Sequence, residues 1–135
     1  LILVLFSLWI IPTSYSEIDK ETQGDLVYSE AMLQEFRDSK ELIFLNFTAD
    51  WCITCKVNER VALKTNAVNE IIRKKNIKYI EADWTRKDSI IAKKLEEFGR
   101  TGVPLYLLYP SEGEPIILPE ILTEDTLINY LSEIK

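Results

Sequence analysis

The sequence predicts an α/β domain with a central mixed sheet, helices on both faces and the element order β-α-β-α-β-α-β-β-α. Short apolar runs of strand length alternate with amphipathic stretches of helix length, which is typical of parallel βαβ units. One run, residues 42–47, is almost continuously apolar, as expected of a strand that is buried on both faces. Only a short turn separates the last two strand candidates, so the sheet should end in an antiparallel hairpin.

The helices are marked by residues that can cap free backbone groups. Ser29, Asp88 and Thr123 each precede an amphipathic stretch, and their side-chain oxygens can accept hydrogen bonds from the first free amides of a helix. Gly99 suits the left-handed position that ends the helix begun by Asp88. The expected helical segments cover residues 29–39, then 53–63 followed by a second helical stretch from 66, which together form the second helical unit of the order, and then 88–98 and 123–134.

The remaining strands are short apolar runs between polar segments. An edge strand is expected at residues 26–28 and a buried strand at 77–82. Residues 104–109 and 116–118 should form the closing hairpin. The turn between them, 110–114, contains Pro, Ser and Gly, which favour turns for distinct physical reasons.

The chain divides into three segments: residues 1–11, a linker at 12–24 and a folded domain at 25–135. Residues 1–11 are apolar except for Ser7, yet eleven helical residues span only about 16 Å, whereas a membrane-spanning helix needs roughly 20 residues. We expect this segment to be the truncated end of a transmembrane helix or the remnant of a signal peptide, rather than a core element of the domain. Both of the favoured interpretations place the domain outside the cytoplasm.

Composition argues against several classes of function. The formal net charge of −6 argues against a nucleic-acid partner, because phosphate binding needs clustered Lys and Arg. The chain has no histidine, which removes the usual general base, the Ser–His and Cys–His nucleophile pairs and the commonest zinc ligand. Any catalysis must therefore use thiols, carboxylates, lysines or hydroxyls.

The two cysteines of the chain, Cys52 and Cys55, lie where the strand at 42–47 leads into the next helix. Such strand-to-helix turns carry functional groups in open α/β sheets. The first amides of the helix would lower the pKa of a partly exposed Cys52 thiol from about 8.5, and so favour the reactive thiolate. Cys55, one turn further along, would be shielded and would resolve a mixed disulfide. The pair predicts thiol–disulfide exchange, with the Cys52–Cys55 disulfide as the redox group and with no bound cofactor or metal.

Three other interpretations of the pair are weaker. A zinc site would need further ligands, and the chain has neither histidine nor a third cysteine. A purely structural disulfide that closes so short a loop would constrain little of the unfolded chain. A buried, unreactive pair conflicts with the flanking Asp50 and Lys56, which indicate a site near the surface.

A second feature is Pro104, which begins an expected strand although proline cannot donate a ladder hydrogen bond. A cis peptide before Pro104 would leave the backbone of Val103 free to pair with an extended substrate segment beside Cys52. The alternative is a trans proline that ends the preceding loop, because cis bonds are only about 5% of X–Pro bonds. The upstream strand–CxxC–helix pattern favours the cis interpretation.

Two tryptophans lie near the predicted site. Trp51 directly precedes Cys52, and we expect its aromatic surface to bind partner proteins rather than to fill the core. Trp84 suits the site and the core equally well.

Four segments together resemble the thioredoxin superfamily, and most closely the C-terminal periplasmic (gamma) domain of the thiol:disulfide interchange protein DsbD and its copper-tolerance relatives. They are FTADWCITCKVNE at 47–59, ADWT at 82–85, FGRTGVPLY at 98–106 and LPEILT at 118–123. The resemblance extends over residues 24–135 and implies a thioredoxin fold. A CxxC motif alone would not be specific, but the set is.

The resemblance also implies a role as a protein-disulfide reductase at the periplasmic face of the bacterial inner membrane. In this family the domain takes electrons from a transmembrane domain and passes them to periplasmic redox proteins, including those of cytochrome c maturation. The chain would then be tethered to the membrane at its N-terminus, and its partners would be the disulfides and dithiols of periplasmic proteins.

For individual residues, the resemblance implies that Cys52 is the nucleophile, Cys55 the resolving thiol and Pro104 the cis-proline. It also implies that Glu59 is a carboxylate near the cysteines that raises their pKa. Asn46 departs from the pattern, because many members carry a buried aspartate at that position. An amide cannot accept the proton of Cys55, so that task would fall to Glu59 or to a water molecule.

Two other functions fit the same residues. A standalone, membrane-anchored periplasmic thioredoxin would use the same chemistry without the relay. A redox-silent binding module would hold extended peptides in a groove beside Pro104 without thiol turnover, and a Cys52→Ser variant would distinguish it from the two enzymes.

Overall fold

The computed structural model describes residues 26–135; the segments expected at 1–11 and 12–24 lie outside the described residues. Its strands are β1 (Leu26–Val27), β2 (Ile43–Thr48), β3 (Lys78–Asp83), β4 (Leu105–Tyr109) and β5 (Ile116–Ile117). Its helices are α1 (Glu30–Asp38), α2 (Ile53–Asn58), α3 (Asn66–Lys74), α4 (Ser89–Glu97) and α5 (Glu124–Glu133), with a π-helical turn η1 (Glu59–Leu63). Within this part of the chain, no helix is long and apolar enough to cross a membrane.

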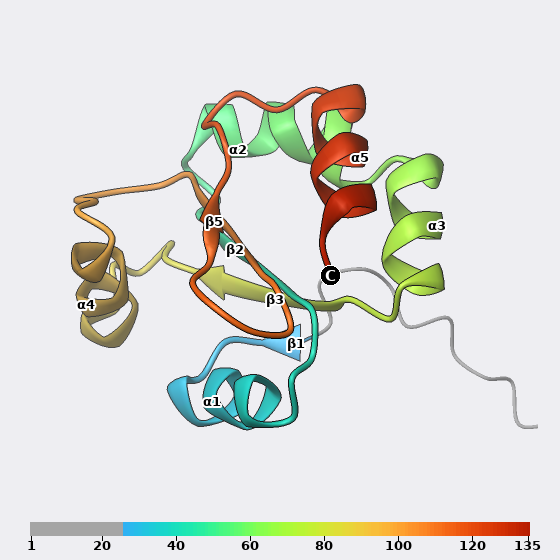
Figure 1. Cartoon of the computed structure of the whole chain (residues 1–135). Helices are drawn as coiled ribbons and strands as arrows, with labels where there is room; N and C mark the ends of the chain where they lie inside the picture. The colour runs from blue at the N-terminus through green and yellow to red at the C-terminus, as the bar shows by residue number, and fades with distance from the viewer. Residues whose placement is uncertain (1–25) are drawn as a thin grey trace, which may run out of the picture.

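The strands form one mixed sheet in the order β1-β3-β2-β4-β5 (Figure 1). Strands β1, β3 and β2 are parallel, β4 runs antiparallel to β2, and β5 closes an antiparallel hairpin with β4. The predicted mixed sheet, its short N-terminal edge strand and its closing hairpin are therefore confirmed. The central position of β2 explains its sequence, because all six of its residues are buried.

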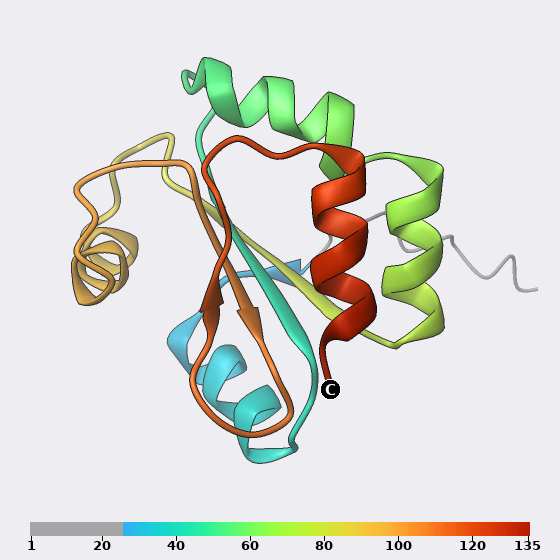
Figure 2. The same ribbon diagram turned by 45° about the horizontal axis from the view of Figure 1, so that its top comes forward.

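Helices cover both faces of the sheet (Figure 2), and each face has its own apolar core. On one face, Phe44 and Tyr106 pack with residues of η1, α3 and α5. On the other, Leu45 and Leu107 pack with residues of α1 and α4. Successive residues of a strand point to opposite faces, so β2 and β4 contribute to both cores.

The predicted helix boundaries are confirmed where a side chain determines them. The side chains of Ser29, Asp88 and Thr123 accept hydrogen bonds from the first amides of α1, α4 and α5. Gly99 has a φ of +69° and follows the last turn of α4, where its amide donates to the carbonyl of Glu96.

The helix expected at 53–63 is different in the structure, because α2 ends at Asn58 and continues as the π-helical turn η1. The amide of Lys64 donates to the carbonyl of Glu59, five residues earlier, at 2.9 Å. Thr65 then caps α3 by accepting a hydrogen bond from the amide of Val68. Hydrophobic spacing predicts a helix but does not distinguish a π-turn from an α-turn, so the sequence could not show this change.

Candidate active site

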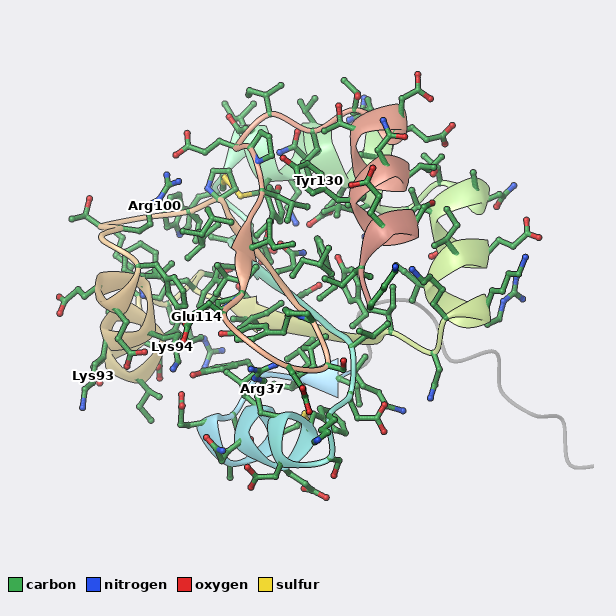
Figure 3. The ribbon with its side chains drawn as sticks, viewed as in Figure 1. Arg37, Lys93, Lys94, Arg100, Glu114 and Tyr130 are labelled. Carbon is green, nitrogen blue, oxygen red and sulfur yellow. A yellow bond between two sulfur atoms is a disulfide. The ribbon has the colours of Figure 1, made fainter. Side chains whose placement is uncertain are left out.

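Cys52 and Cys55 lie at the start of α2, just beyond the end of the central strand β2. Cys52 is the N-cap of the helix, and its Sγ accepts a hydrogen bond from the amide of Cys55 at 3.2 Å. The two cysteines are joined by a disulfide, with their Cα atoms 5.2 Å apart. Figure 3 shows this bond in yellow at the beginning of α2. The helix therefore directs a backbone donor at the sulfur that the sequence identifies as the nucleophile.

The burial of the two sulfur-bearing residues differs in the predicted direction. Cys52 is 7% exposed and Cys55 is 1% exposed. Cys52 is thus more buried than we expected, although it remains the more accessible of the two. The cause is close packing at the turn, where Ala49 and the two cysteines form a small apolar cluster of their own.

The segment around Pro104 lies against this cluster, as predicted. Val103 packs on Ala49, Cys52 and Cys55, although it lies far from them in sequence. The Val103–Pro104 peptide bond is cis. Pro104 itself is buried, and β4 begins at the next residue. Because β4 is hydrogen-bonded to β2, the start of β4 lies beside the end of the strand that leads to the cysteines.

Trp51 lies on the surface beside the disulfide, and 49% of its area is exposed. Its indole N–H donates to the carbonyl of Thr85 at 3.0 Å, and its ring centroid is 6.0 Å from that of Trp84. The ammonium group of Lys87 lies 5.5 Å and 6.0 Å from the two ring centroids. The predicted surface position of Trp51 is correct, and the loop after β3 holds its ring in place.

The sequence did not decide whether Trp84 belongs to the site or to the core, and in the structure Trp84 contacts both. It packs against the apolar core next to α1 and α4, and it also contacts the exposed ring of Trp51. Its indole N–H donates to the carbonyl of Asp88 at 3.1 Å. Trp84 therefore connects the core to the surface beside the site.

Glu59 lies one helical turn after Cys55, and only 13% of its side chain is exposed. Its carboxylate accepts a hydrogen bond from Thr48 Oγ1 at 3.4 Å and forms ion pairs with Lys56 at 3.3 Å and Lys64 at 3.4 Å. Among residues 26–135, these polar contacts go to a hydroxyl and two ammonium groups rather than to either cysteine. Burial lowers the pKa of Lys56, but the hydrogen bond with Glu59 and the charges of Glu59 and Asp50 together raise this pKa above its ordinary value.

Asn46 is fully buried on β2, on the sheet face that α2 and η1 cover. Its Nδ2 donates to the hydroxyl of Tyr79 at 3.0 Å. Its Oδ1 has no hydrogen-bond partner in the described part of the chain. In the sheet, Asn46 lies between Glu81 of β3 and Tyr106 of β4. A polar side chain therefore occupies the position at which the sequence resemblance implies a buried aspartate, but the Asn46 amide cannot take up a proton.

Asn58 is a residue of the site region that our sequence reasoning missed. It is fully buried at the end of α2, where its Nδ2 donates to the Tyr106 hydroxyl at 2.9 Å and to the Glu120 carbonyl at 2.7 Å. Its Oδ1 accepts from the amide of Leu122 at 3.1 Å. The available signal was its spacing, because Cys55, Asn58 and Ala62 follow one another at helical intervals on the buried face.

Comparison with known proteins gives a consistent result. Residues 25–111 match a family model described as thioredoxin-like. The thiol:disulfide interchange protein DsbD of Vibrio cholerae is 23% identical over 136 residues, covering 96% of this chain and 22% of that protein. DsbD of Campylobacter jejuni is 25% identical over 102 residues, covering 76% of this chain and 18% of that protein. The chain thus spans only about a fifth of the length of these relatives.

Solved structures share the fold. The C-terminal domain of Neisseria meningitidis DsbD, in its oxidised form, superposes with a TM-score of 0.66 at 22% identity, covering 82% of this chain and 99% of that domain. A thioredoxin from Thermus thermophilus superposes with a TM-score of 0.62 at 12% identity, covering 80% of this chain and 85% of that protein. The predicted thioredoxin fold is therefore confirmed.

Proposed function

The chain belongs to the thioredoxin-like family, and from that premise we propose that it is a protein thiol–disulfide oxidoreductase that acts through Cys52 and Cys55. One observation carries the proposal. The two cysteines form a disulfide at the N-terminal end of a helix, the more accessible sulfur accepts a backbone hydrogen bond, and Val103 lies against both. This arrangement combines a stabilised thiolate, a neighbouring thiol that can displace it and an adjacent chain segment.

The proposed reaction begins with the reduced pair. The Cys52 thiolate attacks a disulfide of the substrate protein, forms a mixed disulfide and releases one substrate thiol. Cys55 then attacks Cys52 Sγ, which releases the second substrate thiol and closes the Cys52–Cys55 disulfide. In the closed pair the two Cα atoms are 5.2 Å apart, which lies in the range of ordinary disulfides. The disulfide itself is the redox group, and we propose that no further cofactor or metal takes part.

The residues that surround the two sulfur atoms indicate where a substrate protein would bind. We place an extended segment of the substrate alongside Val103, which packs on the pair just before Pro104 and β4. The exposed ring of Trp51 lies on the surface next to Cys52 and offers apolar area for docking. We propose that Glu59, one turn from Cys55, is the carboxylate near the thiols that the sequence resemblance implies.

The more specific role is a reductive relay. The relatives in Vibrio cholerae and Campylobacter jejuni are named thiol:disulfide interchange proteins, and the structure from Neisseria meningitidis is the C-terminal domain of such a protein. We propose that this chain likewise receives electrons from a transmembrane donor domain and passes them to periplasmic redox proteins, including those of cytochrome c biogenesis. It would act while tethered to the periplasmic face of the inner membrane, with no nucleic-acid partner.

The alternative is a standalone, membrane-anchored periplasmic thioredoxin. It is supported by the Thermus thermophilus thioredoxin, of which 85% is covered by the superposition. The two enzymes share the chemistry of the cysteine pair and differ in their electron donor.

Reduction of insulin tests the oxidoreductase activity. The full chain, kept reduced with dithiothreitol, should accelerate precipitation of the insulin B chain well beyond the rate with dithiothreitol alone. A double variant, Cys52→Ser with Cys55→Ser, should restore that uncatalysed rate. If the wild-type chain gives no acceleration, the oxidoreductase proposal is wrong and a redox-silent module remains.

Trp51→Ala should weaken substrate docking without changing the sulfur chemistry. We expect kcat/KM for insulin reduction to fall by about 10-fold, because an exposed aromatic anchor typically contributes 1–2 kcal/mol to protein binding. The reaction of Cys52 with a small aromatic disulfide should change by less than about 2-fold, because that substrate needs little docking surface. An equal loss with both substrates would instead mean that Trp51 supports the geometry of the site.

A further inference from the structure

The unpaired oxygen of Asn46 calls for a physical explanation. Asn46 is 1% exposed, and a buried polar atom without a partner costs about 1–3 kcal/mol. The amide nitrogen of the same side chain is satisfied by the Tyr79 hydroxyl. Asn46 Oδ1 would gain a partner as well if a neighbouring group became a hydrogen-bond donor on taking up a proton.

Glu81 is the neighbouring group that can become such a donor. It pairs with Asn46 in the parallel register of β2 and β3, so both residues point to the sheet face beneath α2 and η1. Glu81 is half-buried, and within residues 26–135 its carboxyl group forms neither an ion pair nor a side-chain hydrogen bond. A protonated Glu81 could donate to Asn46 Oδ1, whereas a carboxylate could not.

The charges around Glu81 favour uptake of a proton. Burial raises the pKa of its carboxyl group, and the negative charges of Glu59 on η1 and Asp83 on β3 raise it further. Lys64 and Lys56, which both form ion pairs with Glu59, lower the pKa of Glu81 and so oppose this effect. The phenols of Tyr79 and Tyr106 face the same region, and burial raises the pKa of both, so they remain neutral.

The redox reaction needs a proton acceptor for the buried Cys55 thiol. Cys55 is 1% exposed, and its thiol must lose a proton before its sulfur can attack the mixed disulfide. Glu59 lies nearest in sequence, but its two oxygens already accept from Thr48, Lys56 and Lys64. The carboxyl group of Glu81 makes no such polar contacts in the described part of the chain. Because it is partly exposed, it can exchange protons with solvent.

We propose that Glu81 is the proton acceptor for Cys55, and that Asn46 Oδ1 holds the transferred proton on the carboxyl group of Glu81. In the resolving step the S–H bond of Cys55 breaks, and its proton passes to Glu81 through a bridging water. The Cys55 sulfur then bonds to Cys52 Sγ, and the bond from Cys52 to the substrate sulfur breaks. That sulfur leaves with the electron pair and is protonated by solvent. The two cysteines are oxidised by two electrons, and the substrate disulfide is reduced.

This inference rests on the proposed function, so the experiment must observe the two cysteines separately. Ellman's reagent achieves this with the reduced full chain in a stopped-flow instrument. Attack by Cys52 releases the first thionitrobenzoate, and attack by Cys55 on the resulting mixed disulfide releases the second. Each phase is measured between pH 5 and 9 for the wild type, for Glu81→Gln and for Glu96→Gln, an exposed residue of α4 that serves as the control.

For Glu81→Gln we expect the second phase at pH 7 to slow by about 100-fold, which is the lower end of the range for loss of a general base. The rate should then increase with hydroxide concentration, while the first phase and the Glu96→Gln control remain close to wild type. Adding Asn46→Asp to Glu81→Gln should restore a fast second phase, because it returns a carboxyl group to the same face. Glu81→Asp, which keeps the acid but shortens its reach, should give intermediate slowing and does not depend on the folding of the Gln variant.

An unchanged or faster second phase in Glu81→Gln would overturn the proposal, since removing a negative charge alone would make the Cys55 thiol easier to ionise. Slowing in Glu59→Gln but not in Glu81→Gln would overturn it too, by assigning the task to Glu59. Absence of the first phase in the wild type would contradict the proposed function itself, because Cys52 would then not be a nucleophile.

Discussion

Cys55→Ser is expected to turn the protein from a catalyst into one that stays covalently joined to its substrate. Cys52 keeps its position at the start of α2 and its backbone hydrogen bond, so it should still attack a protein disulfide. The mixed disulfide then lacks the neighbouring thiol that resolves it. Intramolecular attack by a well-placed group corresponds to a very high effective concentration, so turnover should fall by at least about 10³-fold.

The adduct can be measured directly. Reduced Cys55→Ser mixed with oxidised insulin should yield a species with the summed mass on a non-reducing gel and in mass spectrometry, and dithiothreitol should release it. Cys52→Ser is the matched control, because it differs by the same single atom but leaves only the shielded thiol. If the Cys52→Ser variant forms the adduct and Cys55→Ser does not, the assigned roles of the two sulfurs are reversed.

Asn58→Ala should lower the free energy of unfolding by about 3 kcal/mol, because it leaves several buried polar groups without partners. The groups affected are the amide of Leu122, the carbonyl of Glu120 and the hydroxyl of Tyr106. They belong to β4 and to the segment between β5 and α5, so the variant should also loosen that segment against α2. Urea denaturation followed by circular dichroism measures the effect.

Asn129→Ala provides the comparison for this variant, because Asn129 is exposed on α5 and its loss should cost less than about 0.5 kcal/mol. A destabilisation below about 1 kcal/mol for Asn58→Ala would show that water replaces the lost amide. In that case Asn58 would not be the residue that joins α2 to the segment before α5.

Much of the fold could be predicted because it depends on local patterns. The continuous apolar run of β2 indicated a central strand, and the oxygens of Ser29, Asp88 and Thr123 marked helix starts, since capping involves only neighbouring residues. The position of Cys52 and Cys55 at a strand-to-helix turn followed in the same way. The π-helical turn at Glu59–Leu63 did not, because its hydrogen bonding leaves no distinct mark on hydrophobic spacing.

The part of the site that lies within one segment could be predicted directly from its residues. By itself, the sequence determined that a thiol pair opens a helix after a buried strand, because residue identity and short spacing settle that question. Tertiary structure alone decided that Asn58 holds a distant segment and that Glu81 lies beside Asn46. Those neighbours are set by the order and register of the strands, which join residues far apart in the chain and leave no trace in the residues themselves.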